Sequence, residues 1–158
     1  MSLKLIEQQA EAIRRHGVED YPSECCGVLL GEADGSEKIV REVVRLRNLR
    51  QDPKRAQEVL PVDDTARETE RNRFLIDPHD QLCVEKEARQ RDLDVLGYYH
   101  SHPDHPARPS NYDREHGWPW YSYIILSVEK GEAKDLNSWV LSQDGSAFDA
   151  EQVEVLKP

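Results

Sequence analysis

An apolar and aromatic run from Leu93 to Tyr99, ended by His100, constrains the fold of this chain more than any other segment. Its short length and its aromatic and β-branched content are typical of a central β-strand. The block Cys26–Gly31 is also apolar and has glycines near both ends, which predicts a second buried strand. The two runs therefore predict a sheet whose central strands lie in the core.

Two long helices are predicted beside these strands. Apolar residues at spacings of three and four predict the first over about residues 3–16, with Gly17 as its end. Asp77 and Pro78 suit the N-cap and first turn of a second helix that reaches about Asp92. The residues expected to face the core from this second helix are Leu82, Cys83 and Ala88.

Shorter runs around a hairpin signal, Asp34-Gly35, predict the other strands. Strands mixed with long helices indicate an α/β fold, a mixed β-sheet flanked by helices. The length of 158 residues fits a single domain, residues 1–158. The additional predicted strands are 38–46, 74–76, 121–128, 136–142 and 148–156.

The charge balance excludes some partners. The chain has 21 basic and 31 acidic side chains, and its net charge of −10 repels phosphate backbones, so we expect no nucleic-acid partner. Apolar runs such as Val28–Leu30 are far shorter than the roughly 18 residues that span a bilayer. The first residues lack the pattern of a signal peptide. We therefore expect no membrane association.

The three cysteines, Cys25, Cys26 and Cys83, do not form a disulfide framework, because their number is odd and two of them are adjacent. The sequence also has no C-x-x-C pair that could bind a metal. We expect small, partly buried thiols in a reducing compartment, which favours a cytoplasmic protein.

Two histidines separated by one residue, His100 and His102, follow the predicted central strand. Because side chains alternate along a strand, both imidazoles project from one side and can meet a single metal ion. Asp113, after a proline-rich loop, can supply a third ligand. Two nitrogens and one carboxylate, with a position left for water, are typical of catalytic zinc. An isolated H-x-H pair is usually a surface feature, so the prediction depends on the combination.

Ser110 stands three residues before Asp113, so both side chains can lie on one side of a short helix that Ser110 would also cap. Its hydroxyl could donate to an oxyanion that forms beside the metal. A zinc-bound water, whose pKa is lowered to about 7, needs a base to accept its proton. Glu24 is a candidate base, although spacing alone does not distinguish it from the other acids.

Together these residues resemble the JAMM (MPN+) metallopeptidase family over nearly the whole chain. The family motif is an upstream Glu, then H-x-H, seven residues, Ser, two residues and Asp. It occurs here as Glu24, His100-Ser101-His102, Ser110 and Asp113. The block Glu24–Gly31 also resembles the E-x-C-G-x-L-x-G strand of the family. No ligand position is missing, which argues against a catalytically inactive relative.

The resemblance implies the JAMM/MPN fold, a β-sheet flanked by helices that is similar to that of cytidine deaminases. It implies that His100, His102 and Asp113 bind Zn²⁺. Glu24 would act as general base and then as general acid, and Ser110 would stabilise the tetrahedral intermediate.

Four neighbouring residues match no position of the motif. We expect His105 and His116 to be surface or loop residues. Trp118 and Trp120 are expected to pack at the lip of the site or in the core, and contact with the substrate is the alternative.

Family members cleave peptide or isopeptide bonds after the Gly-Gly tail of ubiquitin or ubiquitin-like proteins. This chain resembles the short, stand-alone prokaryotic type, and enzymes that trim sulfur-carrier proteins of the ThiS/MoaD type are close in pattern. The resemblance therefore implies a zinc peptidase that acts on a ubiquitin-like or sulfur-carrier protein. The long polar segment 49–73, with six acidic and six basic residues, is a candidate wall of the channel to zinc. The oligomeric state is left open.

Three alternatives compete with this interpretation. A RadC-like protein shares the H-x-H-P and P-S-x-x-D signature, but such proteins are longer and have been linked to DNA, which the net charge disfavours. A zinc deaminase needs H-x-E and P-C-x-x-C, and the sequence contains neither. A non-catalytic scaffold or interaction module would keep the metal site for structure alone.

Overall fold

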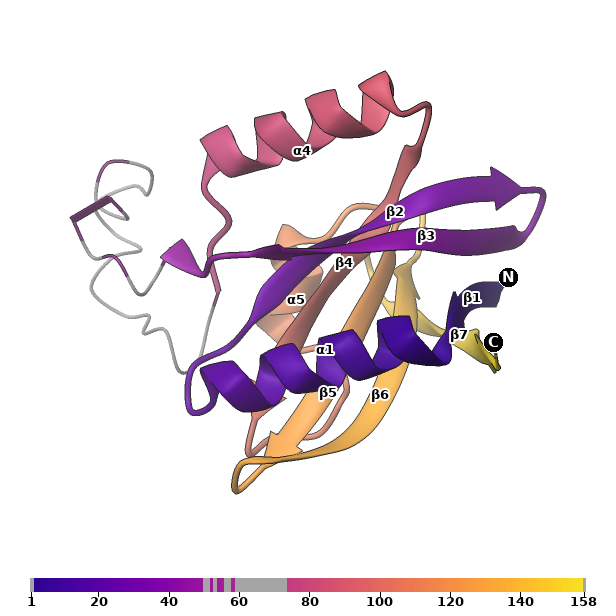
Figure 1. Ribbon diagram of the computed structural model, residues 1–158. Coiled ribbons are helices and arrows are strands. Elements are labelled where there is room, and N and C mark those ends of the chain that lie inside the picture. The colour runs from indigo at the N-terminus through magenta and orange to yellow at the C-terminus, as the bar shows by residue number, and fades with distance from the viewer. Residues whose placement is uncertain (1, 50–51, 53, 56–57, 59–73, 158) are drawn as a thin grey trace.

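A closed sheet with helices packed on it forms the centre of the computed structural model, which describes residues 2–49, 52, 54–55, 58 and 74–157 (Figure 1). This arrangement confirms the predicted α/β class. Most of segment 49–73, the candidate channel wall, lies outside the described residues. In chain order the elements are β1 (Ser2–Ile6), α1 (Glu7–Asp20), β2 (Cys26–Asp34), β3 (Glu37–Leu46), α4 (Pro78–Gln90), β4 (Asp94–Pro103), α5 (Asn111–His116), β5 (Ser122–Glu129), β6 (Glu132–Leu141) and β7 (Phe148–Leu156).

The strands pair in the order β1-β3-β2-β4-β5-β6-β7, and β1 also pairs with β7, which closes the sheet into a barrel. The pairs β1–β3, β1–β7 and β4–β5 are parallel, and the other pairs are antiparallel. β4 lies between β2 and β5, as expected for the run that leads to His100. It extends further than predicted, to Pro103.

The first helix begins later than predicted, because the N-terminal residues form β1. Leu3 and Leu5 are buried and their neighbours are partly exposed, and this period of two belongs to a strand. The apolar residues at helical spacing concealed this alternation. Gln9 then accepts a hydrogen bond from the backbone N–H of Ile6 at 2.9 Å through its Oε1, which helps to start α1. The strand that closes the barrel therefore replaces the predicted first turn of the helix.

Gly17 does not end α1, which continues to Asp20. A Cβ atom at Gly17 would lie 2.5 Å from Cδ2 of Leu126, so the glycine lets α1 pack closely on β5. The helix ends because Pro22 keeps the preceding Tyr21 extended, at φ −52° and ψ 134°.

The two long helices cover opposite sides of the sheet, α1 in front of β5 and β6 and α4 above β2 and β3 in Figure 1. Asp77 caps α4 by accepting from the N–H of His79, as predicted for its position. The expected burial of Leu82 and Cys83 is wrong: Leu82 is 63% exposed, and Cys83 is exposed as well. The buried residues of α4 are Val84 and Ala88, which share a face at a spacing of four.

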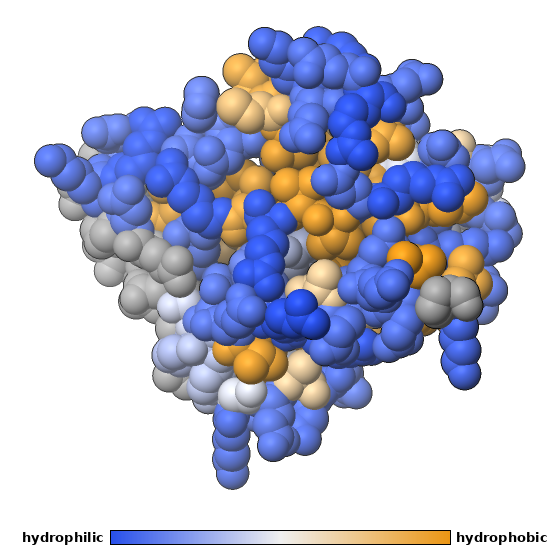
Figure 2. All heavy atoms as spheres, viewed as in Figure 1, coloured by the Kyte–Doolittle hydropathy of each residue, from blue (hydrophilic) through white to orange (hydrophobic). Residues whose placement is uncertain are grey.

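Residues 74–76 form no strand, which corrects a further prediction. The short apolar run packs instead from a loop, because Phe74 and Ile76 contact the cluster beneath α4. Figure 2 shows a mainly hydrophilic surface, with hydrophobic residues visible between α4 and β3. In the part of the chain that the structure describes, no helix is long and apolar enough to span a bilayer.

A buried polar group lies between α1 and the sheet. His16 is 4% exposed, its Nδ1 is 2.7 Å from the Tyr99 hydroxyl, and its Nε2 is 3.3 Å from Oδ2 of Asp20. Burial lowers the pKa of His16 and Arg45 lowers it further, against the opposing attraction of Asp20 and Glu19. The buried ring therefore binds a proton at lower pH than a freely exposed histidine does.

This burial predicts a loss of stability in mild acid. As the pH falls through about 6.5, His16 of the unfolded chain binds a proton more readily than the buried ring, whose pKa is lowered, so the unfolded state gains stability. Urea unfolding at pH 7.5 and 5.5 should show a loss of unfolding free energy that is smaller in His16→Gln by on the order of 1 kcal/mol. Equal losses in the two proteins would contradict a lowered pKa of the buried ring.

Candidate metal centre

β4 presents two imidazoles to the same side. His100 lies opposite Cys26 of β2 and Ile125 of β5, so it belongs to the strand rather than to the loop after it. The Nε2 atoms of His100 and His102 are 3.2 Å apart. The alternation of side chains along the strand thus brings both rings together, as the spacing predicts.

The short helix α5 adds a carboxylate to this pair. Ser110 caps α5, as predicted: its Oγ accepts from the Asp113 N–H at 3.1 Å, and its own N–H donates to Oδ2 of Asp113 at 2.9 Å. The same carboxylate faces the histidines, with Oδ1 3.1 Å from Nε2 of His100 and Oδ2 3.2 Å from Nε2 of His102. The capping interaction therefore also orients the carboxylate.

These distances test whether the three side chains fit a zinc ion. Zinc ligands at about 2.0–2.1 Å from the metal in a tetrahedron lie about 3.3 Å from one another. The two Nε2 atoms are 3.2 Å apart, and each lies 3.1 to 3.2 Å from a different oxygen of Asp113, Oδ1 for His100 and Oδ2 for His102. Two imidazole nitrogens and a carboxylate are therefore close enough together to bind one ion, and this donor set is the one that catalytic zinc uses with a further position for water.

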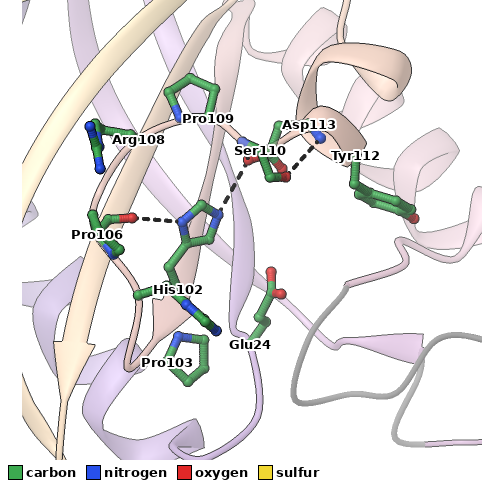
Figure 3. Close-up of a pocket in the computed structure, with 10 residues that line it drawn as sticks. Glu24, His102, Pro103, Pro106, Arg108, Pro109, Ser110, Tyr112 and Asp113 are labelled. Atoms are coloured by element: carbon green, nitrogen blue, oxygen red, sulfur yellow. Dashed lines mark hydrogen bonds and ion pairs between the residues drawn. The ribbon is translucent and has the colours of Figure 1, made fainter.

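Hydrogen bonding and stacking hold the two rings. Nδ1 of His102 lies 2.9 Å from the carbonyl oxygen of Pro106, which can only accept, so Nδ1 carries the proton and Nε2 keeps its lone pair (Figure 3). Nδ1 of His100 is buried and finds no hydrogen-bond partner among the described residues. The His100 ring is instead stacked on Phe74, with centroids 4.6 Å apart.

Glu24 approaches the histidines from the segment between α1 and β2. Its side chain is 4% exposed, and one ligand atom from each of Glu24, His100 and His102 lies within 4.8 Å of the others. Figure 3 shows its carboxylate pointing toward the space between His102 and α5. The structure thus brings all five residues of the motif to one place.

The site opens into a cavity of about 550 Å³ with a wall of prolines. Burial raises the pKa of Asp113, but the attraction of His100 and hydrogen bonds from His100 and His102 outweigh it and hold that pKa well below its ordinary value. The carboxylate is therefore ionised, as a metal ligand must be. The lining residues are Glu24, His102, Pro103, His105, Pro106, Arg108, Pro109, Ser110, Tyr112 and Asp113.

The structure also places the other residues singled out in the sequence. His105 is exposed on the cavity wall. His116 stacks on Tyr112, with centroids 4.0 Å apart, and lines a second, aromatic cavity with Trp118, which is 69% exposed. Trp120 is 41% exposed and lies beneath the Lys38 ammonium, 4.4 Å from the ring centroid.

Sequence reasoning missed three residues that support the site. Ser101 points away from the metal side of β4, and its Oγ accepts from the N–H of Cys25 at 2.8 Å. Strand alternation could have suggested this role. Phe74, against His100, and Asn48, which donates to the carbonyl of Glu24 at 2.9 Å, have no signal in the sequence, because they lie far from the motif along the chain.

Comparisons with known proteins show which family this chain resembles. Residues 7–142 match the family described as prokaryotic homologs of the JAB domain. The desampylase of Haloferax volcanii is 30% identical over 132 residues, which cover 80% of this chain and 81% of that protein. The solution structure of a Desulfitobacterium hafniense protein has a TM-score of 0.77 and 29% identity, over 99% of this chain and 94% of that one.

A more distant likeness shows the fold alone. The crystal structure of a JAB1/MPN domain protein from Archaeoglobus fulgidus has a TM-score of 0.53 at 16% identity, over 99% of this chain and 97% of that one. The family match spans most of the chain and includes Glu24, Ser110 and the three candidate ligands. The chain belongs to the prokaryotic JAB family, as a hydrolase of the JAMM (MPN+) type.

Proposed function

We propose that this chain is a zinc-dependent peptidase or isopeptidase that hydrolyses the bond after the Gly-Gly tail of a ubiquitin-like or sulfur-carrier protein. The observation that carries the proposal is the triangle of His100, His102 and Asp113, with contacts of 3.1 to 3.2 Å, and Glu24 at its side. The substrate class is supported by the name of the relative that is 30% identical, desampylase. We assign the activity to one domain, residues 1–158, in the cytoplasm.

Zinc held by His100, His102 and Asp113 would supply a Lewis acid and lower the pKa of a water molecule to about 7. Two hydrogen bonds orient these ligands. The backbone N–H of Ser110 donates to the Asp113 carboxylate, and Nδ1 of His102 donates to the carbonyl of Pro106. Such outer contacts keep the ligand atoms aimed at one point.

Glu24 is the proposed proton carrier. Its buried carboxylate lies beside the histidine pair, where it can accept the proton of the attacking water and then give it to the departing amine. Without that second transfer the amine would leave as an unstable anion. One side chain therefore serves as base and acid in turn.

Ser110 is the proposed oxyanion donor. Its Oγ accepts the N–H of Asp113, and this bond does not use the hydroxyl proton. The proton can therefore be donated to the oxygen that gains charge when the carbonyl is attacked.

A tail of two glycines suits the wall of the cavity. Pro103, Pro106 and Pro109 line it, and proline rings restrict the backbone, so the wall has little freedom to move away from a bulky side chain. A glycine has no side chain to accommodate. The selection of Gly-Gly would thus be steric.

The function is tested with a sulfur carrier that has residues appended after Gly-Gly, and with the same carrier joined to a lysine ε-amine. The zinc-loaded chain should cleave one or both, as followed by mass spectrometry. Glu24→Gln keeps the size of the side chain but cannot accept a proton, so kcat should fall about 10²- to 10⁴-fold with zinc content unchanged.

Glu32→Gln is the matched control, because Glu32 lies exposed near the far end of β2 and makes an ion pair with Arg41. It should cleave like the wild type. Undiminished cleavage by Glu24→Gln would refute the mechanism. Bound zinc without turnover on any Gly-Gly-extended carrier would favour the non-catalytic scaffold.

Removal of the metal or of one ligand should abolish cleavage. Chelation should stop the reaction and lower the Tm, because zinc binds the folded state, and added zinc should restore both.

Asp113→Asn removes a ligand charge, so zinc affinity should fall by more than about 10-fold in a competition titration. Asp149→Asn, an exposed position on β7, is the control. Zinc affinity that is equal in the two variants would exclude Asp113 as a ligand.

A further inference from the structure

A buried amide lies directly behind Glu24. Asn48 follows the end of β3 and is 2% exposed. Its Nδ2 donates to the carbonyl oxygen of Glu24 at 2.9 Å, and its Oδ1 accepts from the N–H of Leu75 at 3.0 Å. One side chain thus joins two segments that are far apart in the sequence.

The partners determine the orientation of this amide. A carbonyl only accepts and an N–H only donates, so Nδ2 must face Glu24 and Oδ1 must face Leu75. An aspartate at position 48 could keep the second contact but not the first. The contact with Glu24 is buried and the contact with Leu75 is partly buried, so the loss of either hydrogen bond costs stability.

The contact with Glu24 completes a clamp on one peptide unit. Glu24 and Cys25 lie between α1 and β2, outside helix and strand. The carbonyl of the peptide between them accepts from Asn48, and its N–H donates to Oγ of Ser101 at 2.8 Å. Side chains thus satisfy both polar groups of this peptide unit, and they hold the backbone from which the Glu24 carboxylate projects.

The Oδ1 end of the Asn48 amide contacts the loop that packs against His100, a proposed metal ligand. Leu75 donates to Asn48 and accepts from the N–H of Leu49 at 2.7 Å, which holds the loop before α4 against the end of β3. The preceding residue, Phe74, stacks on His100. The position of Glu24 and the packing of His100 therefore depend on the same side chain.

We propose that Asn48 is a positioning residue for the hydrolytic reaction. It acts through Glu24, because it holds the backbone that keeps the Glu24 carboxylate beside the histidine pair, where that carboxylate accepts and returns the proton. This role rests on the function proposed above. A displacement of about 1 Å in such a group can lower the rate about 10²-fold.

The test compares Asn48→Asp with Asn48→Ala. The aspartate keeps the acceptor for Leu75 and loses the donor to Glu24, and the alanine loses both without adding a buried charge. In each zinc-loaded variant kcat should fall roughly 10- to 100-fold while KM stays within about twofold, because the amide acts on the base and not on substrate binding. Two variants are needed since the buried aspartate could prevent folding.

Gln9→Glu is a matched control. Gln9 also bridges two backbone groups, because its Nε2 donates to the carbonyl of Val40 at 3.1 Å while its Oε1 accepts from Ile6. The same exchange of amide for carboxylate there loses one donor and adds one charge, between α1 and β3. It should lower the Tm and leave kcat unchanged.

Amide hydrogen exchange supplies a readout that does not depend on turnover. In the zinc-loaded Asn48 variants, exchange should accelerate at least about 10-fold in peptides that cover residues 23–29 and 74–77 and stay unchanged in α1. In Gln9→Glu, exchange should instead accelerate in α1 and stay unchanged in residues 23–29 and 74–77. Unchanged exchange around Glu24, or a kcat that falls only in proportion to lost zinc or unfolded protein, would overturn the proposal. A wild-type chain that cleaves no carrier would refute the proposed function separately. The exchange experiment would still show whether Asn48 holds the backbone at Glu24.

Discussion

The alternation of side chains along β4 connects the metal centre to the core. His100 and His102 project to one side, where α5 supplies a carboxylate. Tyr99 and Ser101 project to the other side, where Tyr99 contacts His16 and Ser101 binds the backbone of Cys25. A shift of the strand by one residue would exchange the two sets. The pairing of β4 with β2 and β5 therefore determines the core and the site together.

Around this strand, single contacts serve both structure and chemistry. The Ser110–Asp113 pair satisfies the first turn of α5 and aims the carboxylate at the histidines. The bond from His102 to Pro106 anchors the proline loop and leaves Nε2 available to a metal. Because each contact has two consequences, loosening of the fold near the site also disturbs the ligand geometry. The net charge of −10 has no such double role in structure and chemistry. The site uses two acids, Glu24 and Asp113, and most of the others lie at the surface.

Much of the fold and site could be predicted because the signals are local. The strand before His100, the caps at Asp77 and Ser110, and the late strands follow from neighbouring residues. Errors arose where local signals compete. Apolar residues at helical spacing conceal β1, and Gly17 predicts a helix end although it allows close contact between α1 and Leu126. Such contacts across the molecule leave little trace in a local pattern.

The sequence by itself determined the donor types and their spacing, because strand alternation and helix capping act within a few residues of His100, His102 and Asp113. Only the tertiary structure decided which distant groups complete the site. Spacing could not distinguish Glu24 from the other acids, and it contained no sign of Asn48 or Phe74. Those residues reach the histidines because the closure of the sheet and the loop before α4 bring them there, and such long-range packing depends on the whole fold.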